Sequence, residues 1–245
     1  MSVYKASIQK DQSIAKEYYQ KSVVKTQQQV FLETLLSAGD TNNPLKIGDI
    51  ACGGGTLTYH LKKLYPGSAF TLVDFNEDAL KLAEELNGTE NCSYLNDTVY
   101  SLDKIGDAAF DHVFCWQTLS WLDQPEKALD ALLRVTRKGG TLFLSSLFNL
   151  KFDVDLYTNV FDHTRESTKD GLYVHYNTYS AHTVGQWLKD KVSGFRFYEF
   201  MPTDDIPQNM DNKGLGTFTT LTSEGQRLQV SGGLLMNWAI LVIEK

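Results

Sequence analysis

A run of three glycines at the end of a short apolar segment constrains this chain more than any other feature. The segment spans residues 45–56 and reads LKIGDIACGGGT. Glycine has no Cβ and lets the backbone pass close to a ligand, and the helical pattern that follows offers free N–H groups at its first turn. The segment therefore predicts a strand that delivers its carboxyl end to a bound cofactor.

A second acid stands at the end of the next predicted strand. Residues 69–76 read AFTLVDFN, which places Asp74 at the strand's end. In a Rossmann-like unit, a carboxylate binds the ribose hydroxyls of a nucleotide. It lies at about this distance along the chain from the glycine turn. Because the two signals occur at matched spacing, we expect a cofactor that contains a nucleoside.

Two details of the turn bear on which nucleoside it binds. The dinucleotide fingerprint G-x-G-x-x-G would need a glycine at position 58, where the chain has Thr58. Asp49, just before the turn, would repel a pyrophosphate but suits a cationic ligand. An NAD(P)-dependent oxidoreductase therefore stays as an alternative, and a non-catalytic cofactor-binding member of the same fold is a third hypothesis.

The turn resembles the first motif of the class I S-adenosylmethionine-dependent methyltransferases, D/E-x-G-x-G-x-G. Asp49, Gly53 and Gly55 match it, and Ala51 stands at the first glycine. Three later segments are similar to later motifs of the same family, in the same order: 96–98, 109–119 and 132–144. The resemblance covers roughly residues 45 to 146 and implies S-adenosyl-L-methionine as cofactor and methylation of a small molecule, with O-methylation favoured.

The resemblance also implies a Rossmann-like α/β fold with a seven-stranded, mostly parallel sheet and an antiparallel last strand. Alternating strand and helix patterns independently predict a parallel sheet flanked by helices. Because 245 residues suit one sizeable core, we expect a single domain with three parts. These parts are an N-terminal helical lid (1–43), a cofactor-binding core (44–146), and an acceptor-site insertion with the C-terminal strands (147–245).

Individual elements follow from periodicity and capping residues. Helices are predicted within 10–38 and over 56–64, 76–87, 125–136 and 180–191; strands over 194–201 and 234–243; and an extra β-hairpin over 217–230. The stretch 148–179 has no clear period and is expected to shape the acceptor site.

The resemblance assigns cofactor contacts residue by residue. Gly53 and Gly55 would allow the backbone to approach the cofactor, Asp49 would orient donors around its ammonium end, and Asp74 would accept both ribose hydroxyls. The later motifs supply the other expected contacts: Phe75 along the adenine face, Asp97 and Thr98 near the exocyclic amine, and Trp116 and Gln117 beside the transferred methyl group. For Asp97 an alternative stays open, since an acid in a turn commonly caps the next segment.

Acceptor-side residues are expected in the irregular stretch and near the N-terminus. An alcohol acceptor benefits from a general base, so His163 and His175 are candidate catalytic residues, although a loop histidine is often only structural. Arg165 would pair an anionic acceptor or be neutralised by neighbouring acids. Tyr18 and Tyr19 are candidate lid residues that contact substrate.

The glycine-rich tail resembles bacterial methyltransferases of surface-polysaccharide gene clusters. It covers residues 225–238 and reads GQRLQVSGGLLMNW. This resemblance favours a sugar, or a phosphorylated sugar intermediate, as the molecule that is O-methylated.

The other titratable residues are expected to be structural. His112 is predicted to pack within a strand and His60 to lie on a helix surface. Cys52, Cys92 and Cys115 have no C-x-x-C spacing and are expected to be small reduced side chains. Because the histidines lack helical metal-binding spacing, we expect no metal.

Composition limits the expected partners. The net charge is −7, from 23 basic and 30 acidic residues, without a dense Lys/Arg stripe, so we expect a small-molecule substrate and no nucleic acid. Residues 1–29 lack an apolar secretory stretch, and the longest apolar runs are too short to span a bilayer. These features predict a cytoplasmic protein that does not contact a membrane, as a monomer or homodimer.

Overall fold

The computed structural model describes residues 24–37, 43–161, 163, 171, 173–207, 217–231, 234–235 and 238–245. The part of the predicted N-terminal helices before residue 24 lies outside these residues, as do Tyr18, Tyr19 and Arg165.

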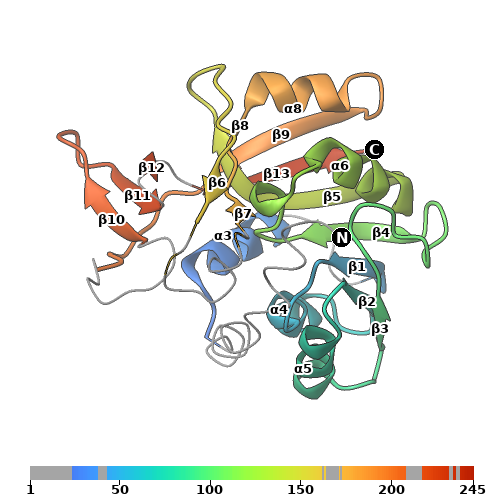
Figure 1. Cartoon of the computed structure of the whole chain (residues 1–245). Coiled ribbons are helices and arrows are strands. Elements are labelled where there is room, and N and C mark those ends of the chain that lie inside the picture. Colours follow the sequence, from blue (N-terminus) through green and yellow to red (C-terminus); the bar gives the residue numbers. More distant parts are fainter. Residues whose placement is uncertain are drawn as a thin grey trace.

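The main sheet has the strand order β3-β2-β1-β4-β5-β13-β9 (Figure 1). Its strands are β1 (Lys46–Ile50), β2 (Ala69–Asp74), β3 (Cys92–Asn96), β4 (Phe110–Cys115), β5 (Thr136–Asn149), β9 (Gly194–Glu199) and β13 (Trp238–Glu244). The strands from β1 to β5 pair in parallel, whereas β13 runs antiparallel to both β5 and β9. A short strand, β8 (Tyr179–Ser180), pairs with the end of β5. The predicted Rossmann-like sheet with an antiparallel last strand is therefore confirmed.

Two of the helices begin directly after a side chain that caps them. The described helices are α3 (Gln27–Leu36), α4 (Thr56–Leu64), α5 (Glu77–Asn87), α6 (Pro125–Val135) and α8 (Ala181–Leu188), with a 3₁₀ turn η1 (Leu119–Trp121). Asn76 caps α5 by accepting the backbone N–H groups of Asp78 and Ala79, and Ser180 caps α8 in the same way. Since α8 ends at Leu188, it is shorter than the predicted 180–191.

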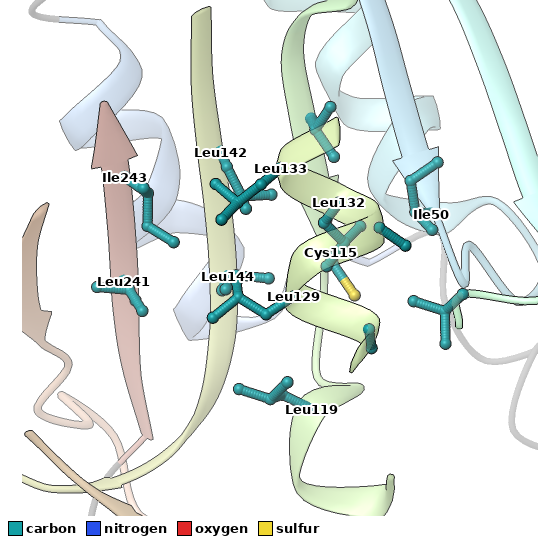
Figure 2. Packing of buried hydrophobic residues seen from close by; sticks show 14 of the residues in the cluster. Ile50, Cys115, Leu119, Leu129, Leu132, Leu133, Leu142, Leu144, Leu241 and Ile243 are labelled. Carbon is teal, nitrogen blue, oxygen red and sulfur yellow. The ribbon is translucent and has the colours of Figure 1, made fainter. Parts of the chain in front are cut away.

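Helices cover both faces of the main sheet, so the central strands β1, β2 and β4 are mostly buried, whereas the outer strands β3 and β9 are more exposed. Figure 2 shows Leu129, Leu132 and Leu133 of α6 packed beside Leu142 and Leu144 of β5, all of them buried. On the other face, α3 and α4 contribute to a second buried cluster. Burying one such leucine contributes about 1.5–3 kcal/mol, so this packing fixes the sheet edge that carries the site.

The C-terminal third adds a separate antiparallel sheet of β10 (Phe218–Leu221), β11 (Arg227–Ser231) and β12 (Leu234–Leu235). This sheet lies at the left of Figure 1 and confirms the predicted extra hairpin. The prediction of one continuous strand over 234–243 is wrong, because β12 pairs with β11 whereas β13 pairs with β5 and β9. An apolar run does not reveal that the chain changes sheets within it.

The irregular stretch after β5 contains a small two-stranded ribbon of β6 (Asn159–Val160) and β7 (Val174–His175). In the described ranges, no helix has the length and apolar character needed to cross a bilayer.

Candidate functional site

The glycine turn follows β1 and adopts left-handed backbone conformations. The φ angles are 58° at Ala51, 54° at Gly53 and 73° at Gly55, which is the N-cap of α4. The Cys52 N–H donates to the Val73 carbonyl at 3.0 Å, which ties the turn to β2. A left-handed alanine costs roughly 1–2 kcal/mol, so Ala51 occupies a position where glycine would be the relaxed residue.

Asp74 joins this turn to the end of β2. Its Oδ2 accepts the Gly53 N–H and its Oδ1 accepts the Asn76 N–H, both at 2.9 Å. The side chain is 8% exposed, and burial raises its pKa. Each carboxylate oxygen still has a lone pair for a second donor. The carboxylate is therefore held in one orientation at the place expected for a ribose diol.

Asp49 presents a free oxygen at the same turn. Thr58 Oγ1 donates to its Oδ2 at 2.7 Å, while Oδ1 has no hydrogen-bond partner among the described residues. The side chain is 1% exposed, and burial, with a contribution from Asp74, raises its pKa to about 6. A buried acceptor without a donor costs about 1–3 kcal/mol, so the site fits a ligand that brings a donor, such as an ammonium group.

Thr58 was considered only as a missing glycine, and its role in holding Asp49 was not predicted. The signal available in the sequence is a hydroxyl in the first turn of the helix that follows the acid. At 0% exposure the hydroxyl needs an acceptor, and Asp49 provides it.

Gly55 is required for helix packing. A Cβ there would lie 2.6 Å from Asn87 Nδ2 and 2.9 Å from the Ala83 Cβ, both on α5. Asn87 Nδ2 also donates to the Gly55 carbonyl at 3.0 Å. The α-carbon of Gly55 therefore faces α5, while its expected contribution to cofactor approach stays a prediction.

The loop after β3 brings Asp97 beside the end of β2. Its N–H donates to the Asp74 carbonyl at 3.1 Å. Its Oδ1 accepts the Thr98 N–H at 2.7 Å and its Oδ2 accepts the Lys104 N–H at 2.8 Å. Asp97 therefore caps the next segment, which was the alternative considered from the sequence. The contacts of Asp97, Thr98 and the half-buried Phe75 with an adenine stay predictions.

The carboxyl ends of β4 and β5 meet helix α3. Gln117, with φ 52°, follows the half-buried Trp116 and donates from Nε2 to Gln28 Oε1 at 2.8 Å. Ser145 donates to the same oxygen at 3.4 Å. Gln28 was not predicted as a site residue, since its signal in the sequence is only a glutamine at an inward-facing helix position. These contacts place α3 over the edge of the sheet that carries Asp49 and Asp74.

Residues 48–144 match the family model described as "Methyltransferase domain". This part of the chain is therefore similar to a methyltransferase domain. The matched segment begins at β1 and ends within β5, so it contains the glycine turn, Asp74, Asp97 and Gln117.

Curated relatives of the methyltransferase domain include the ubiquinone biosynthesis O-methyltransferases of two bacteria. The protein of Xanthomonas oryzae pv. oryzae is 30% identical over 105 residues, which are 42% of this chain and 43% of that protein. The protein of Methylococcus capsulatus is 33% identical over 104 residues, with the same two shares. The chain spans less than half the length of these curated relatives.

Solved structures share the fold at low sequence identity. A Haloferax volcanii methyltransferase, solved in complex with the activator Trm112, has a TM-score of 0.59 at 12% identity and covers 87% of each chain. A Bacillus halodurans methyltransferase has a TM-score of 0.56 at 16% identity, covering 86% of this chain and 96% of that one. The Burkholderia thailandensis 1,6-didemethyltoxoflavin-N1-methyltransferase was solved with S-adenosylhomocysteine. It has a TM-score of 0.51 at 15% identity, and the match covers 89% of this chain and 76% of that one.

The candidate bases lie outside the methyltransferase domain segment. His163 is exposed, and His175 is half-buried on β7, with its ring edge-on to Tyr173 at 5.6 Å. The next residue, Tyr176, follows the end of β7 and is buried against Trp121.

The prediction for one histidine on a helix is wrong. His60 is not on a helix surface: it is 4% exposed, and its nitrogens have no hydrogen-bond partner in the described ranges. Burial lowers its pKa, with Lys25 and Lys63 adding to the effect. The cause is the packing of the segment around α3 against α4, which the pattern of α4 alone does not contain. His112 packs between Tyr65 and Phe143, as expected.

The three cysteines have the environments of structural side chains. Cys115 is buried, Cys52 and Cys92 are half-buried, and all three are free thiols. Burial raises the pKa of Cys115 to about 12, which keeps the thiol protonated and unreactive. No cluster of potential metal ligands occurs within the residues that the structure describes.

Proposed function

We propose that this chain transfers a methyl group from S-adenosyl-L-methionine to an oxygen of a small molecule. The observation that supports this most is the unpartnered Oδ1 of Asp49, buried beside the fixed carboxylate of Asp74. An anionic pocket of this kind favours a cofactor with a positively charged end and a ribose, whereas it disfavours a diphosphate. The family match over 48–144 likewise favours methyl transfer over the nicotinamide alternative.

Bound S-adenosylmethionine supplies a methyl group on a positively charged sulfur; its transfer forms an O–C bond, breaks the C–S bond and releases the acceptor's proton. The chain's own residues would bind the cofactor and orient its methyl group toward the acceptor. Asp49 would accept from the ammonium group, and Asp74 from the ribose hydroxyls. Trp116 and Gln117, at the end of β4, would line the space beside the methyl group and exclude water.

His163 and His175 are the proposed bases for the acceptor's proton. A neutral imidazole suits this role near pH 7, and His175 lies on the ribbon whose next residue, Tyr176, packs on η1. Arg165, Tyr18 and Tyr19 are the proposed substrate contacts. The division into a lid (1–43), a core (44–146) and an acceptor-site insertion (147–245) belongs to the same proposal.

Two classes of methyl acceptor are proposed. The names of the curated relatives support a hydroxyl of a biosynthetic intermediate. The resemblance of the tail 225–238 supports a sugar or a phosphorylated sugar of surface-polysaccharide synthesis. The described part of this tail forms β11 and β12, with Arg227 paired to Asp205 at 2.7 Å, so these residues also have a structural role.

Calorimetry tests the cofactor assignment. S-adenosylhomocysteine should bind the wild type and bind Asp74→Ala at least tenfold more weakly. The absence of binding by the wild type, or equal binding by both, would remove the proposal, and saturable NADH binding would favour the oxidoreductase. Cofactor binding without turnover across a broad acceptor panel would favour a non-catalytic member of the fold. Light scattering would distinguish the proposed monomer from a homodimer.

A further inference from the structure

Helix α3 meets the carboxyl edge of the main sheet through polar side chains of its first turn. Gln28 is 7% exposed, and its Oε1 accepts from Gln117 Nε2 at 2.8 Å and from Ser145 Oγ at 3.4 Å. The buried apolar residues of α3, Leu32 and Leu36, come later in the helix. The first turn, residues 27–30, contains no buried apolar side chain. Its position over the sheet edge therefore depends on the hydrogen bonds that it forms.

On its outer side, the first residue of α3 binds the loop 202–206. Gln27 Oε1 accepts the Thr203 N–H at 2.7 Å and the Asp204 N–H at 3.1 Å. Gln27 Nε2 donates to the Asp204 carbonyl at 3.3 Å. Because these bonds use both ends of the amide, they orient the side chain as well as attach it. The loop is thus attached to α3 one residue before Gln28.

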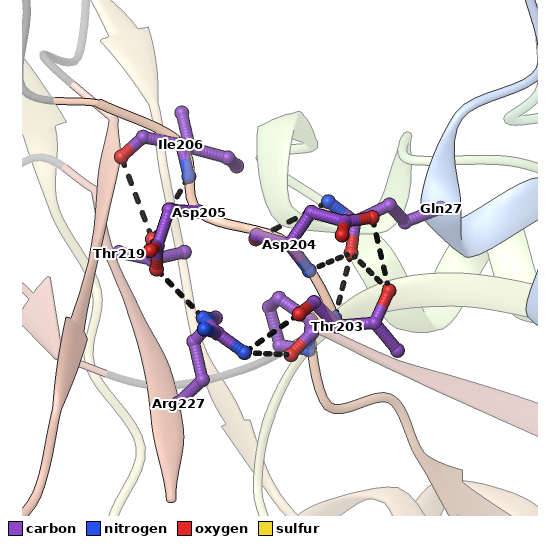
Figure 3. Close-up of polar contacts among 8 residues, drawn as sticks. Gln27, Thr203, Asp204, Asp205, Ile206, Thr219 and Arg227 are labelled. Atoms are coloured by element: carbon purple, nitrogen blue, oxygen red, sulfur yellow. Dashed lines mark hydrogen bonds and ion pairs between the residues drawn. The ribbon is translucent and has the colours of Figure 1, made fainter.

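Arg227 of β11 holds the same loop from the other side, as Figure 3 shows. Its Nη1 donates to the Thr203 carbonyl at 2.7 Å, and its Nε donates to Asp205 Oδ1 at 2.7 Å. A planar guanidinium that binds two acceptors fixes the distance between them. Thr203 is therefore the residue at which Gln27 and Arg227 meet, since its N–H binds the first and its carbonyl binds the second.

The small sheet of β10, β11 and β12 is connected to α3 through this loop. Within the described ranges, none of its three strands pairs with a strand of the main sheet. Thr219 of β10 binds the loop instead: its Oγ1 accepts the Ile206 N–H at 2.9 Å, and its own N–H donates to the Ile206 carbonyl at 3.0 Å. The small sheet therefore supports the loop that holds the first turn of α3.

We propose that Arg227 is a positioning residue for the cofactor: by holding the loop at Thr203, it keeps α3 closed over the carboxyl edge and slows release of the bound cofactor. This inference rests on the proposed function, which places S-adenosyl-L-methionine at Asp49 and Asp74 on that edge. A segment that covers a site must move before the ligand leaves, so bonds that hold the segment slow dissociation. Arg227 then acts on the site without touching cofactor or acceptor.

The test measures the rate at which S-adenosylhomocysteine dissociates from the full chain, by stopped-flow competition, together with thermal unfolding. Arg227→Met removes both donors, and Gln27→Met breaks the link on the other side of Thr203. Arg137→Met is the matched control. Arg137 Nε pairs with Asp111 Oδ1 at 2.5 Å, the same two atom types as in the Arg227 pair, but near the start of β4 and β5, at the opposite edge of the sheet.

We expect Arg227→Met and Gln27→Met each to speed dissociation of S-adenosylhomocysteine about three- to tenfold. The double variant should release it at most about twofold faster than the faster single variant, because both substitutions break one link in series. Arg227→Lys keeps the charge but not the planar fork, and its rate should fall between those of the wild type and Arg227→Met. Arg137→Met should stay within about twofold of the wild type, whatever its effect on thermal unfolding.

Wild-type dissociation rates in both single variants overturn the inference while the proposed function stands. So does a double variant whose acceleration is the product of the two single ones, because the two residues then act independently. Equal acceleration in Arg137→Met also overturns it, since the cause is then a general loss of stability. If Arg227→Met does not fold, Gln27→Met and Arg227→Lys decide by the same rates. A wild type that does not bind S-adenosylhomocysteine removes the proposed function and the inference together.

Discussion

Thr58 Oγ1 donates a 2.7 Å hydrogen bond to Asp49 Oδ2 across the glycine turn. The threonine belongs to the first turn of α4 and the aspartate to the last part of β1, so the bond joins the two elements that form the turn. It leaves Asp49 Oδ1 as the oxygen available to a ligand. The orientation of the Asp49 carboxylate thus depends on a residue of α4 as well as on β1.

Replacing Thr58 by valine should weaken cofactor binding. The variant keeps the shape of the side chain but removes the donor, which leaves both oxygens of Asp49 without a side-chain partner. We expect S-adenosylhomocysteine to bind about three- to tenfold more weakly, and the free energy of unfolding to fall by about 1–3 kcal/mol. Calorimetry and urea denaturation measure the two effects. Thr58→Ser keeps the hydroxyl and should stay near the wild type; an equal loss in both variants would contradict the role of the hydrogen bond.

The raised pKa of Asp49 predicts opposite pH trends for stability and cofactor binding. Burial raises its pKa to about 6 in the folded protein, above that of an aspartate in the unfolded chain, so the folded state binds the proton more tightly. The unfolding free energy of the free protein should therefore rise by about 1 kcal/mol from pH 7 to pH 5. S-adenosylhomocysteine affinity should fall over the same range, because the ammonium group needs the carboxylate.

Asp49→Asn provides the control for both trends. It should flatten the pH dependence of binding and reduce the dependence of stability. Some dependence of stability should remain, because burial also raises the pKa of Asp74 and acts in the same direction. An unchanged stability profile in Asp49→Asn would show that this carboxyl group titrates normally.

Gly55→Ala should destabilise the protein more than Gly88→Ala. Both glycines have left-handed φ angles, 73° and 69°. A Cβ at Gly88 would meet nothing within 4 Å, whereas one at Gly55 would lie 2.9 Å from the Ala83 Cβ. For Gly88→Ala we expect a loss of roughly 1–3 kcal/mol from backbone strain alone, because φ 69° with ψ −175° is a conformation essentially confined to glycine. For Gly55→Ala we expect an additional loss of roughly 1–3 kcal/mol from overpacking, and equal losses in urea denaturation would contradict this.

Replacing the candidate bases tests the acceptor side. If His175 removes the acceptor's proton, His175→Asn should lower kcat about 10²- to 10⁴-fold and leave S-adenosylhomocysteine affinity unchanged. The same assay on His163→Asn compares the two candidates. His182→Asn, on the exposed side of α8, is the control and should keep the wild-type rate. Wild-type rates in both candidate variants would remove the histidine base.

The main sheet and its helices were predictable because their signals are local. Asn76 and Ser180 mark helix starts through their own side chains, and the apolar runs of β1 and β2 end on acids within the same short segments. The break between β12 and β13 was not predictable, because it depends on which distant strand each half of an apolar run pairs with.

The sequence by itself determined the glycine turn, its two acids and the type of cofactor they suit, since these are properties of contiguous residues. Only the tertiary structure decided that Thr58 holds Asp49, that His60 is buried, and that Gln28 reaches Gln117. Those relationships arise where separate elements pack together. The physical reason is that burial and hydrogen-bond partners belong to the surface that covers a residue, and for Gln28 and His60 that surface comes from elsewhere in the chain.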